Sequence, residues 1–140
     1  MPSQIHDSHT SVKFKWTLTE FSKLGCNHES GHFALGNLRW KLHIYPKGDN
    51  NTHSHFSLFL IPVDKTKLPY VEFSVCSITS HSGHKHNFKN LVKKHQLTHD
   101  RNRVGWSALM SLHDLHTHYV QHDTVTIEIK VTCRTREARA

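Results

Sequence analysis

Two segments at opposite ends of the chain alternate between apolar and polar residues. Every second residue is apolar from Val12 to Leu18, and the same alternation runs from Val125 to Val131. A period of two places the apolar residues on one face of a β-strand and the polar residues on the other. We therefore expect both ends of the chain to share one core, which favours a single closed all-β domain over two modules on a linker.

The length of the chain agrees with a single domain. A chain of 140 residues is long enough to bury a substantial core. Residues 1–10 are polar and show no periodicity, so we expect a loose tail there. The domain is then expected over residues 11–133, with a C-terminal tail over residues 134–140.

Targeting signals and cysteine spacing point to a reducing compartment. No apolar run approaches the roughly 20 residues of a membrane span, and the N-terminal residues lack the basic-then-apolar layout of a secretory signal. Cys26, Cys76 and Cys133 are odd in number and widely spaced, unlike a disulfide framework. We expect a cytoplasmic or nuclear protein without membrane contact.

The remaining segments complete a sandwich. Extended segments are predicted at 32–36, 38–45, 56–61, 70–78 and, more weakly, 88–92, with a polar loop over 93–103. Trp106, Leu109 and Met110 are spaced helically, which predicts a short amphipathic helix over 106–112, and Ser111 is a candidate cap for the turn that follows. The fold class predicted is all-β, an antiparallel β-sandwich of seven to eight strands with one short helix. The residues predicted to form its core are Trp16, Trp40, Leu42, Leu58, Phe73, Val125, Ile127 and Ile129.

Positive charge is concentrated in one part of the chain. The formal net charge is +7 with 16 histidines, and residues 85–103 are the densest basic segment. Such a segment is typical of a solvated loop and edge strand, where lysine opposes aggregation. The alternative is a surface that binds nucleic acid or another polyanion. Base stacking needs exposed aromatic residues, and this segment offers only Phe88, which argues against nucleic acid.

Neither a metal centre nor a catalytic site is predicted. Histidines recur at 81, 84 and 86 and again at 113, 116 and 118, but neither group is accompanied by the Cys-x-x-Cys or His-Glu-x-x-His patterns of zinc sites. The chain has no Gly-x-Ser-x-Gly elbow, no cysteine in a recognisable nucleophile context and no glycine-rich phosphate loop. We expect no cofactor, no bound metal and no enzymatic activity.

Several blocks of sequence together resemble the MATH (meprin and TRAF homology) domain. They include the Trp-Lys-Leu-x-Ile-Tyr-Pro-x-Gly block that starts at Trp40 and the Asp-x-Val-x-Ile block that starts at Asp123. The resemblance extends over about residues 11–133. It implies an eight-stranded antiparallel sandwich that binds short extended peptides in a shallow groove on one sheet. It also implies an adaptor or a substrate-recognition domain in ubiquitin or signalling pathways. Because the chain has no heptad repeat, oligomerisation is expected only through regions outside it.

The resemblance also implies which residues line the groove. The groove aromatic of the Ser-Leu-aromatic-Leu run falls on Phe59, and a second groove position falls on Val71. The family's Asp-Trp-Gly-Phe motif aligns with Arg103-Val104-Gly105-Trp106, which replaces an acid by a base and removes one aromatic residue. With Lys93, Lys94 and Arg101 nearby, a positive groove margin is expected, and with it a preference for acidic or phosphorylated peptides.

Overall fold

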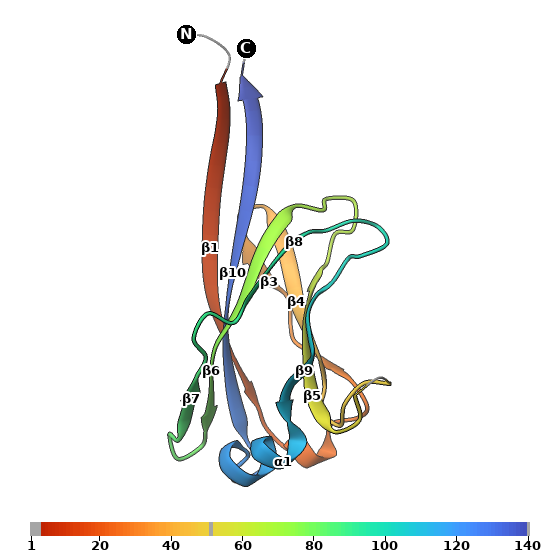
Figure 1. The fold of residues 1–140 in the computed structure, drawn as a ribbon, viewed down its shortest axis with the longest axis vertical. Coiled ribbons are helices and arrows are strands. Elements are labelled where there is room, and N and C mark those ends of the chain that lie inside the picture. Colours follow the sequence, from red (N-terminus) through yellow and green to blue (C-terminus); the bar gives the residue numbers. More distant parts are fainter. Residues whose placement is uncertain (1–3, 51, 140) are drawn as a thin grey trace.

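Two antiparallel sheets face each other across one core (Figure 1). The computed structural model describes residues 4–50 and 52–139, and the side chains of residues 10–50 and 52–133. The first sheet has the order β1-β10-β6-β7, with β8 also pairing with β6, and the second has the order β2-β4-β5-β9, with β3 also pairing with β4. The strands of the first sheet are β1 (Gln4–Leu18), β6 (Tyr70–Ser80), β7 (Lys85–Asn87), β8 (Val92–Gln96) and β10 (Val125–Arg139). Those of the second are β2 (His28–Glu29), β3 (Phe33–Leu35), β4 (Leu38–Tyr45), β5 (His55–Pro62) and β9 (Val104–Ser111).

The alternation of the sequence sets which side chains reach the core. Along β10, Val125, Ile127, Ile129 and Val131 are all buried, as their period of two requires. Seven of the eight residues predicted as core are buried in one cluster. The exception is Trp16, which is half-buried and packs against the margin of that cluster. The predicted all-β sandwich is therefore confirmed.

The first and last strands continue into the ranges predicted as tails. β1 begins at Gln4 and β10 ends at Arg139, and their backbones remain paired along the whole length, from Gln4 opposite Arg139 to Leu18 opposite Val125. The two strands run side by side beyond the other strands, toward the two ends of the chain (Figure 1). Backbone hydrogen bonds between antiparallel strands do not require a buried face, so polar composition alone did not reveal this ribbon.

Three sequence predictions between residues 85 and 112 are wrong. The segment over 106–112, predicted as a helix, is β9 as far as Ser111, and helix α1 spans only Leu112–Asp114. Of the strand predicted at 88–92, only Val92 is in a strand, because β7 ends at Asn87 and β8 begins at Val92. β8 continues to Gln96, so it includes the first part of the predicted 93–103 loop. The cap is confirmed, because the backbone N–H of Asp114 donates to Ser111 Oγ at 3.1 Å.

Short helices connect the strands at the end of the sandwich away from the termini (Figure 1). A 3₁₀ helix spans Phe21–Lys23, and a π-helix spans Leu115–Tyr119 directly after α1. Leu115 and Tyr119 are buried and attach the π-helix to the core. This end of the molecule also carries most of the histidines between residues 81 and 122, whose rings contact Tyr119 and one another.

The two open sides of the sandwich are closed by different chemistry. On the side of β1, Phe14 stacks on Phe33 of β3 at a ring-centroid distance of 4.6 Å, and Trp16 stacks on His28 of β2 at 5.6 Å. On the opposite side, β8 of the first sheet faces β9 of the second. There the lysine Lys93 reaches from one sheet to the other.

Candidate functional site

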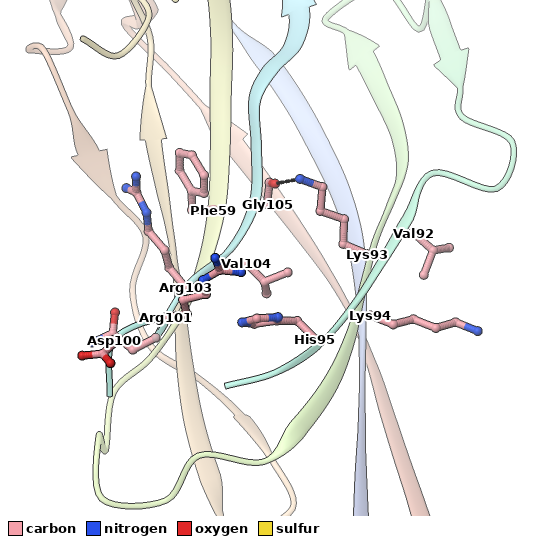
Figure 2. Close-up of a pocket in the computed structure, with 11 residues that line it drawn as sticks. Phe59, Val92, Lys93, Lys94, His95, Asp100, Arg101, Arg103, Val104 and Gly105 are labelled. Atoms are coloured by element: carbon pink, nitrogen blue, oxygen red, sulfur yellow. Dashed lines mark hydrogen bonds between the residues drawn. The ribbon is translucent and has the colours of Figure 1, made fainter. Parts of the chain in front are cut away.

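A hollow of about 620 Å³ lies on the side where β8 faces β9. Its walls are these two strands and the loop that connects them (Figure 2). Its margin is rich in cationic and imidazole side chains: Lys93, Lys94, His95, Arg101 and Arg103, with Asp100 as the acid among the lining residues. Phe59, Val104 and Gly105 contribute the less polar part of its wall.

The connecting loop has a fixed form that places two arginines at the hollow. Leu97 is buried, and its backbone N–H donates to the Pro69 carbonyl at 3.2 Å. Thr98 and Arg101 exchange backbone hydrogen bonds of 3.0 and 3.1 Å, and Thr98 Oγ1 accepts a further bond from Arg101 N. This turn directs the chain back into β9 and leaves Arg101 and Arg103 on the margin.

Gly105 allows β5 and β9 to approach unusually closely. It lies opposite Phe59 in the register of the two strands. A Cβ atom added at Gly105 would lie 2.7 Å from Phe59 Cα and would overlap the Leu58 carbonyl oxygen. The position therefore requires glycine for reasons of space, and its φ angle is not the cause.

Lys93 connects the two edge strands. Its ammonium group donates a hydrogen bond of 2.6 Å to the Gly105 carbonyl oxygen (Figure 2) and lies 5.5 Å from the centroid of the Trp106 ring. The neighbouring Lys94 points to the other side of β8, where its ammonium lies 3.6 Å from Glu72 Oε1. Successive residues of a strand face opposite ways, which explains the different partners of the two lysines.

Arg103 covers the aromatic residue predicted to form the groove. Its guanidinium carbon lies 4.0 Å from the centroid of the Phe59 ring, a cation–π arrangement, and Nη1 donates to Tyr45 Oη at 3.4 Å. Tyr45 contacts Phe59 edge-on at 6.1 Å and stacks on His43 at 4.8 Å. The outer face of the second sheet thus carries a row of planar groups with a cation at its margin, and Phe59 is only 6% exposed.

The charges at the hollow are largely uncompensated. Within residues 10–50 and 52–133, the ion pairs of 4.0 Å or less include Lys94 with Glu72 but do not include Lys93, Arg101 or Arg103. Burial lowers the pKa of His43 below its ordinary value. The Glu29 carboxylate opposes this effect, whereas Arg103 and Lys41 add to it. An anion at the hollow would meet exposed positive charge at Lys93, Arg101 and Arg103, which no described carboxylate within 4.0 Å neutralises, and it could accept charge-assisted hydrogen bonds from them.

The structure brings together four of the six predicted site residues. Phe59, Arg103, Val104 and Gly105 all line the hollow. Val71 does not, because it is completely buried in the first sheet, opposite Cys133 and His95.

Trp106 also faces the core. It turns away from the outer face and packs on Phe73 at a centroid distance of 5.4 Å. Phe59 and Trp106 therefore lie on opposite faces of the second sheet, and a groove that contains both is excluded.

Two residues of the site escaped the sequence prediction. His43 and Tyr45 lie on the polar-facing side of β4, and His43 is directly opposite Phe59 in the register of β4 and β5. The alternation of residues 38–45 already placed both side chains on the face away from the core. Combining this alternation with the position assigned to Phe59 would have identified His43 and Tyr45 as its neighbours.

The described residues contain no cluster suited to a metal ion. No group of three or more His, Cys, Asp or Glu side chains within the described part of the chain has the arrangement needed to hold one. This includes the histidines at 81, 84 and 86 and those at 113, 116 and 118.

Comparison with known proteins identifies the fold. The sequence matches the MATH domain family over residues 13–131. The chain belongs to the MATH domain family. MATH domains are non-catalytic protein–protein interaction modules.

Plant proteins are among the relatives of this MATH domain. It is 30% identical over 133 residues to ubiquitin C-terminal hydrolase 13 of Arabidopsis thaliana, a match that covers 89% of this chain and 12% of the hydrolase. It is 32% identical over 108 residues to a MATH domain and coiled-coil domain-containing protein of the same plant, covering 71% of this chain and 32% of that protein. A shorter match, 43% identical over 58 residues, covers 41% of this chain and 19% of the Arabidopsis protein RESTRICTED TEV MOVEMENT 3.

This MATH domain spans only a small part of each of these relatives. A match to 12% of a hydrolase does not extend hydrolase activity to this chain. No helix within the described residues is both long enough and apolar enough to cross a membrane.

Proposed function

We propose that this MATH domain recognises short extended peptides along the free edge of β9 and prefers peptides that carry acidic or phosphorylated residues. β9 is the last strand in the order of its sheet, and an edge strand offers unpaired backbone groups to an incoming strand. Backbone hydrogen bonds would supply affinity, and the hollow beside the edge would select the side chain.

The observation that carries the proposal is the group of Lys93, Arg101 and Arg103 at the hollow. None of the three belongs to the described ion pairs, and Asp100 is the acid among the lining residues. An anionic side chain would neutralise charge there without first breaking an ion pair. The relatives that carry the same module include a ubiquitin hydrolase. We therefore propose a role as an adaptor or substrate-recognition domain in ubiquitin or signalling pathways, in the cytoplasm or nucleus.

The test is a comparison of three peptides with identical backbones. A degenerate octapeptide array identifies a binder with a central Glu, and its phosphoserine and Gln counterparts are then titrated by calorimetry. Arg103→Asp is expected to weaken the Glu peptide by about 1 kcal/mol or more, the size of a lost charge-assisted contact. Lys130→Glu makes the same change in net charge on the opposite sheet, so it serves as the matched control.

Two results would contradict the proposal. One is equal binding of the Glu and Gln peptides at low salt. The other is an equal loss of affinity in Arg103→Asp and Lys130→Glu, which would indicate a dependence on net charge alone. Raising the salt concentration is expected to slow association more than it speeds dissociation, because the margin is solvent-exposed.

Polyanion binding is the alternative, and the same cationic residues favour it. Sequence-tolerant nucleic-acid binding combines positive charge with exposed aromatic faces on which bases stack. At this hollow, Arg103 covers Phe59 and the Trp106 ring faces Phe73. This arrangement supports the peptide over the polyanion. If a single-stranded RNA oligonucleotide binds as tightly as the Glu peptide, the polyanion becomes the favoured ligand.

A further inference from the structure

The Gly105 carbonyl oxygen is a backbone acceptor at the free edge of β9. Gly105 pairs with Phe59 of β5 on one side, and Lys93 reaches its carbonyl from β8 on the other side (Figure 2). This oxygen is therefore directed away from β5, beyond the edge of the sheet, toward the space that an added strand would occupy. A peptide that pairs with β9 at this position needs the oxygen for one of its own N–H groups.

In the free protein this acceptor is already occupied. The Lys93 ammonium donates a short, charge-assisted hydrogen bond to it, with a donor–acceptor distance of 2.6 Å. The same ammonium lies 5.5 Å from the centroid of the Trp106 ring, which provides a second favourable contact for the cation. A peptide N–H is a neutral donor and is weaker than the ammonium that it would have to displace.

We propose, on the basis of the proposed peptide-binding function, that Lys93 is a gate that makes strand addition at Gly105 depend on an anionic side chain in the ligand. The carboxylate or phosphate takes the Lys93 ammonium, and the Gly105 carbonyl becomes free for the peptide backbone. A neutral peptide must break the same hydrogen bond and leaves the exposed ammonium with water alone in exchange. Lys93 therefore discriminates in both directions, because it attracts acidic peptides and obstructs neutral ones.

Arg103 and Lys94 contact other groups and have no such role. Arg103 is held over Phe59 and near Tyr45, and Lys94 lies near Glu72. Neither has a described hydrogen bond to a backbone acceptor of β9. Removing Lys93 should therefore change the binding of neutral peptides in a way that removing either of the others does not.

The test variant is Lys93→Met, which keeps a long apolar stem on Trp106 and removes the ammonium. The control is Lys130→Met, which removes the same charge from an exposed residue of β10 that does not line the hollow. Each protein is titrated with the Glu octapeptide and its Gln counterpart, after thermal melts show that both variants fold. A phosphoserine arm tells whether phosphate or carboxylate is the stronger trigger.

The expected result is a change of opposite sign for the two peptides. Lys93→Met binds the Gln peptide more tightly than the wild type does and binds the Glu peptide more weakly, so the ratio of the two affinities falls by about tenfold, in line with one charge-assisted hydrogen bond. Lys130→Met leaves the ratio unchanged. The carbonyl ¹³C resonance of Gly105 in free Lys93→Met should also shift in the direction that the Glu peptide produces in the wild type.

Two different failures can be told apart. If both peptides bind but Lys93→Met binds the Gln peptide no better than the wild type does, the gate is overturned and the proposed function stands. If neither peptide binds the wild type or the variant, the proposed function is overturned and the gate with it.

Discussion

At the scale of single residues, Arg103 changes the character of the outer face beside the hollow. The resemblance implies an acid at this position, whereas the guanidinium carbon of Arg103 lies 4.0 Å from the centroid of the Phe59 ring. An aromatic ring that would otherwise offer an apolar surface is covered by a cation. A ligand that binds as proposed would therefore meet hydrogen-bond donors at this point of the outer face.

The titration of His43 tests how strongly the outer face of the second sheet buries its side chains. The Nε2 atom of His43 is buried and has no hydrogen-bond partner among the described residues, and its Nδ1 atom lies 4.0 Å from Glu29 Oε2. Burial lowers the pKa of His43 below the ordinary value of 6.5. The unfolded chain then takes up a proton on this residue first as the pH falls. The contribution of His43 to the free energy of unfolding is complete above about pH 6.5 and is lost as the pH falls through the lowered pKa.

We predict that His43→Phe makes the free energy of unfolding less dependent on pH between about pH 7 and 5. The phenyl ring preserves the stack on Tyr45, and the other histidines are common to both proteins, so their titration cancels in the comparison. Urea unfolding at several pH values measures the slope. An unchanged slope would show that the imidazole takes up its proton freely in the folded state.

The sequence distinguished core from surface better than it distinguished core from groove. The resemblance placed Phe59, Arg103 and Val71 in a groove; in the structure the first two line the hollow, whereas Val71 is completely buried. An apolar residue in an alternating strand has the same appearance whether its face meets a ligand or the other sheet. Only the packing of one sheet on the other decides between the two.

At the scale of elements, β9 shows how a local period misleads. Trp106, Leu109 and Met110 have helical spacing, yet the segment pairs with β5 over most of its length. The pairing shifts register between Phe56 and Leu58, and Ser57 Oγ donates to the Ser107 carbonyl at 2.6 Å. Such an irregularity interrupts the period of two, so the sequence alone could not indicate a strand here.

The close approach of β5 and β9 gives a second prediction. We expect Gly105→Ala to lower the free energy of unfolding by about 1–3 kcal/mol, because the new methyl group would force apart the backbones at Leu58 and Phe59. Gly31→Ala is the control, since a Cβ there meets nothing within 4 Å. Chemical denaturation of the two variants checks this, and equal stabilities would show that the strands separate at no cost.

At the scale of the whole molecule, the sandwich depends on one core in which Trp40 is central. Trp40 has no exposed surface and lies opposite Phe33 of β3 and Pro62 of β5. We predict that Trp40→Ala costs roughly 3–5 kcal/mol, as expected for removing a large buried side chain. Val92→Ala, at a residue 44% exposed, should change the free energy of unfolding by less than about 0.5 kcal/mol. A loss below about 1 kcal/mol for Trp40→Ala would contradict the position of this side chain.

The two sides of the sandwich are joined by different sets of contacts. Ring pairs join the sheets beside β1, and the Phe73–Trp106 ring pair joins them beside β9, where the side chain of Lys93 also reaches from one sheet to the other. Separating packed aromatic rings exposes apolar surface to water, but moving the exposed ammonium of Lys93 exposes little. Displacing Lys93 can therefore enlarge the hollow while the ring pairs keep the two sheets together, so side chains of different bulk can enter it without a change in the rest of the fold.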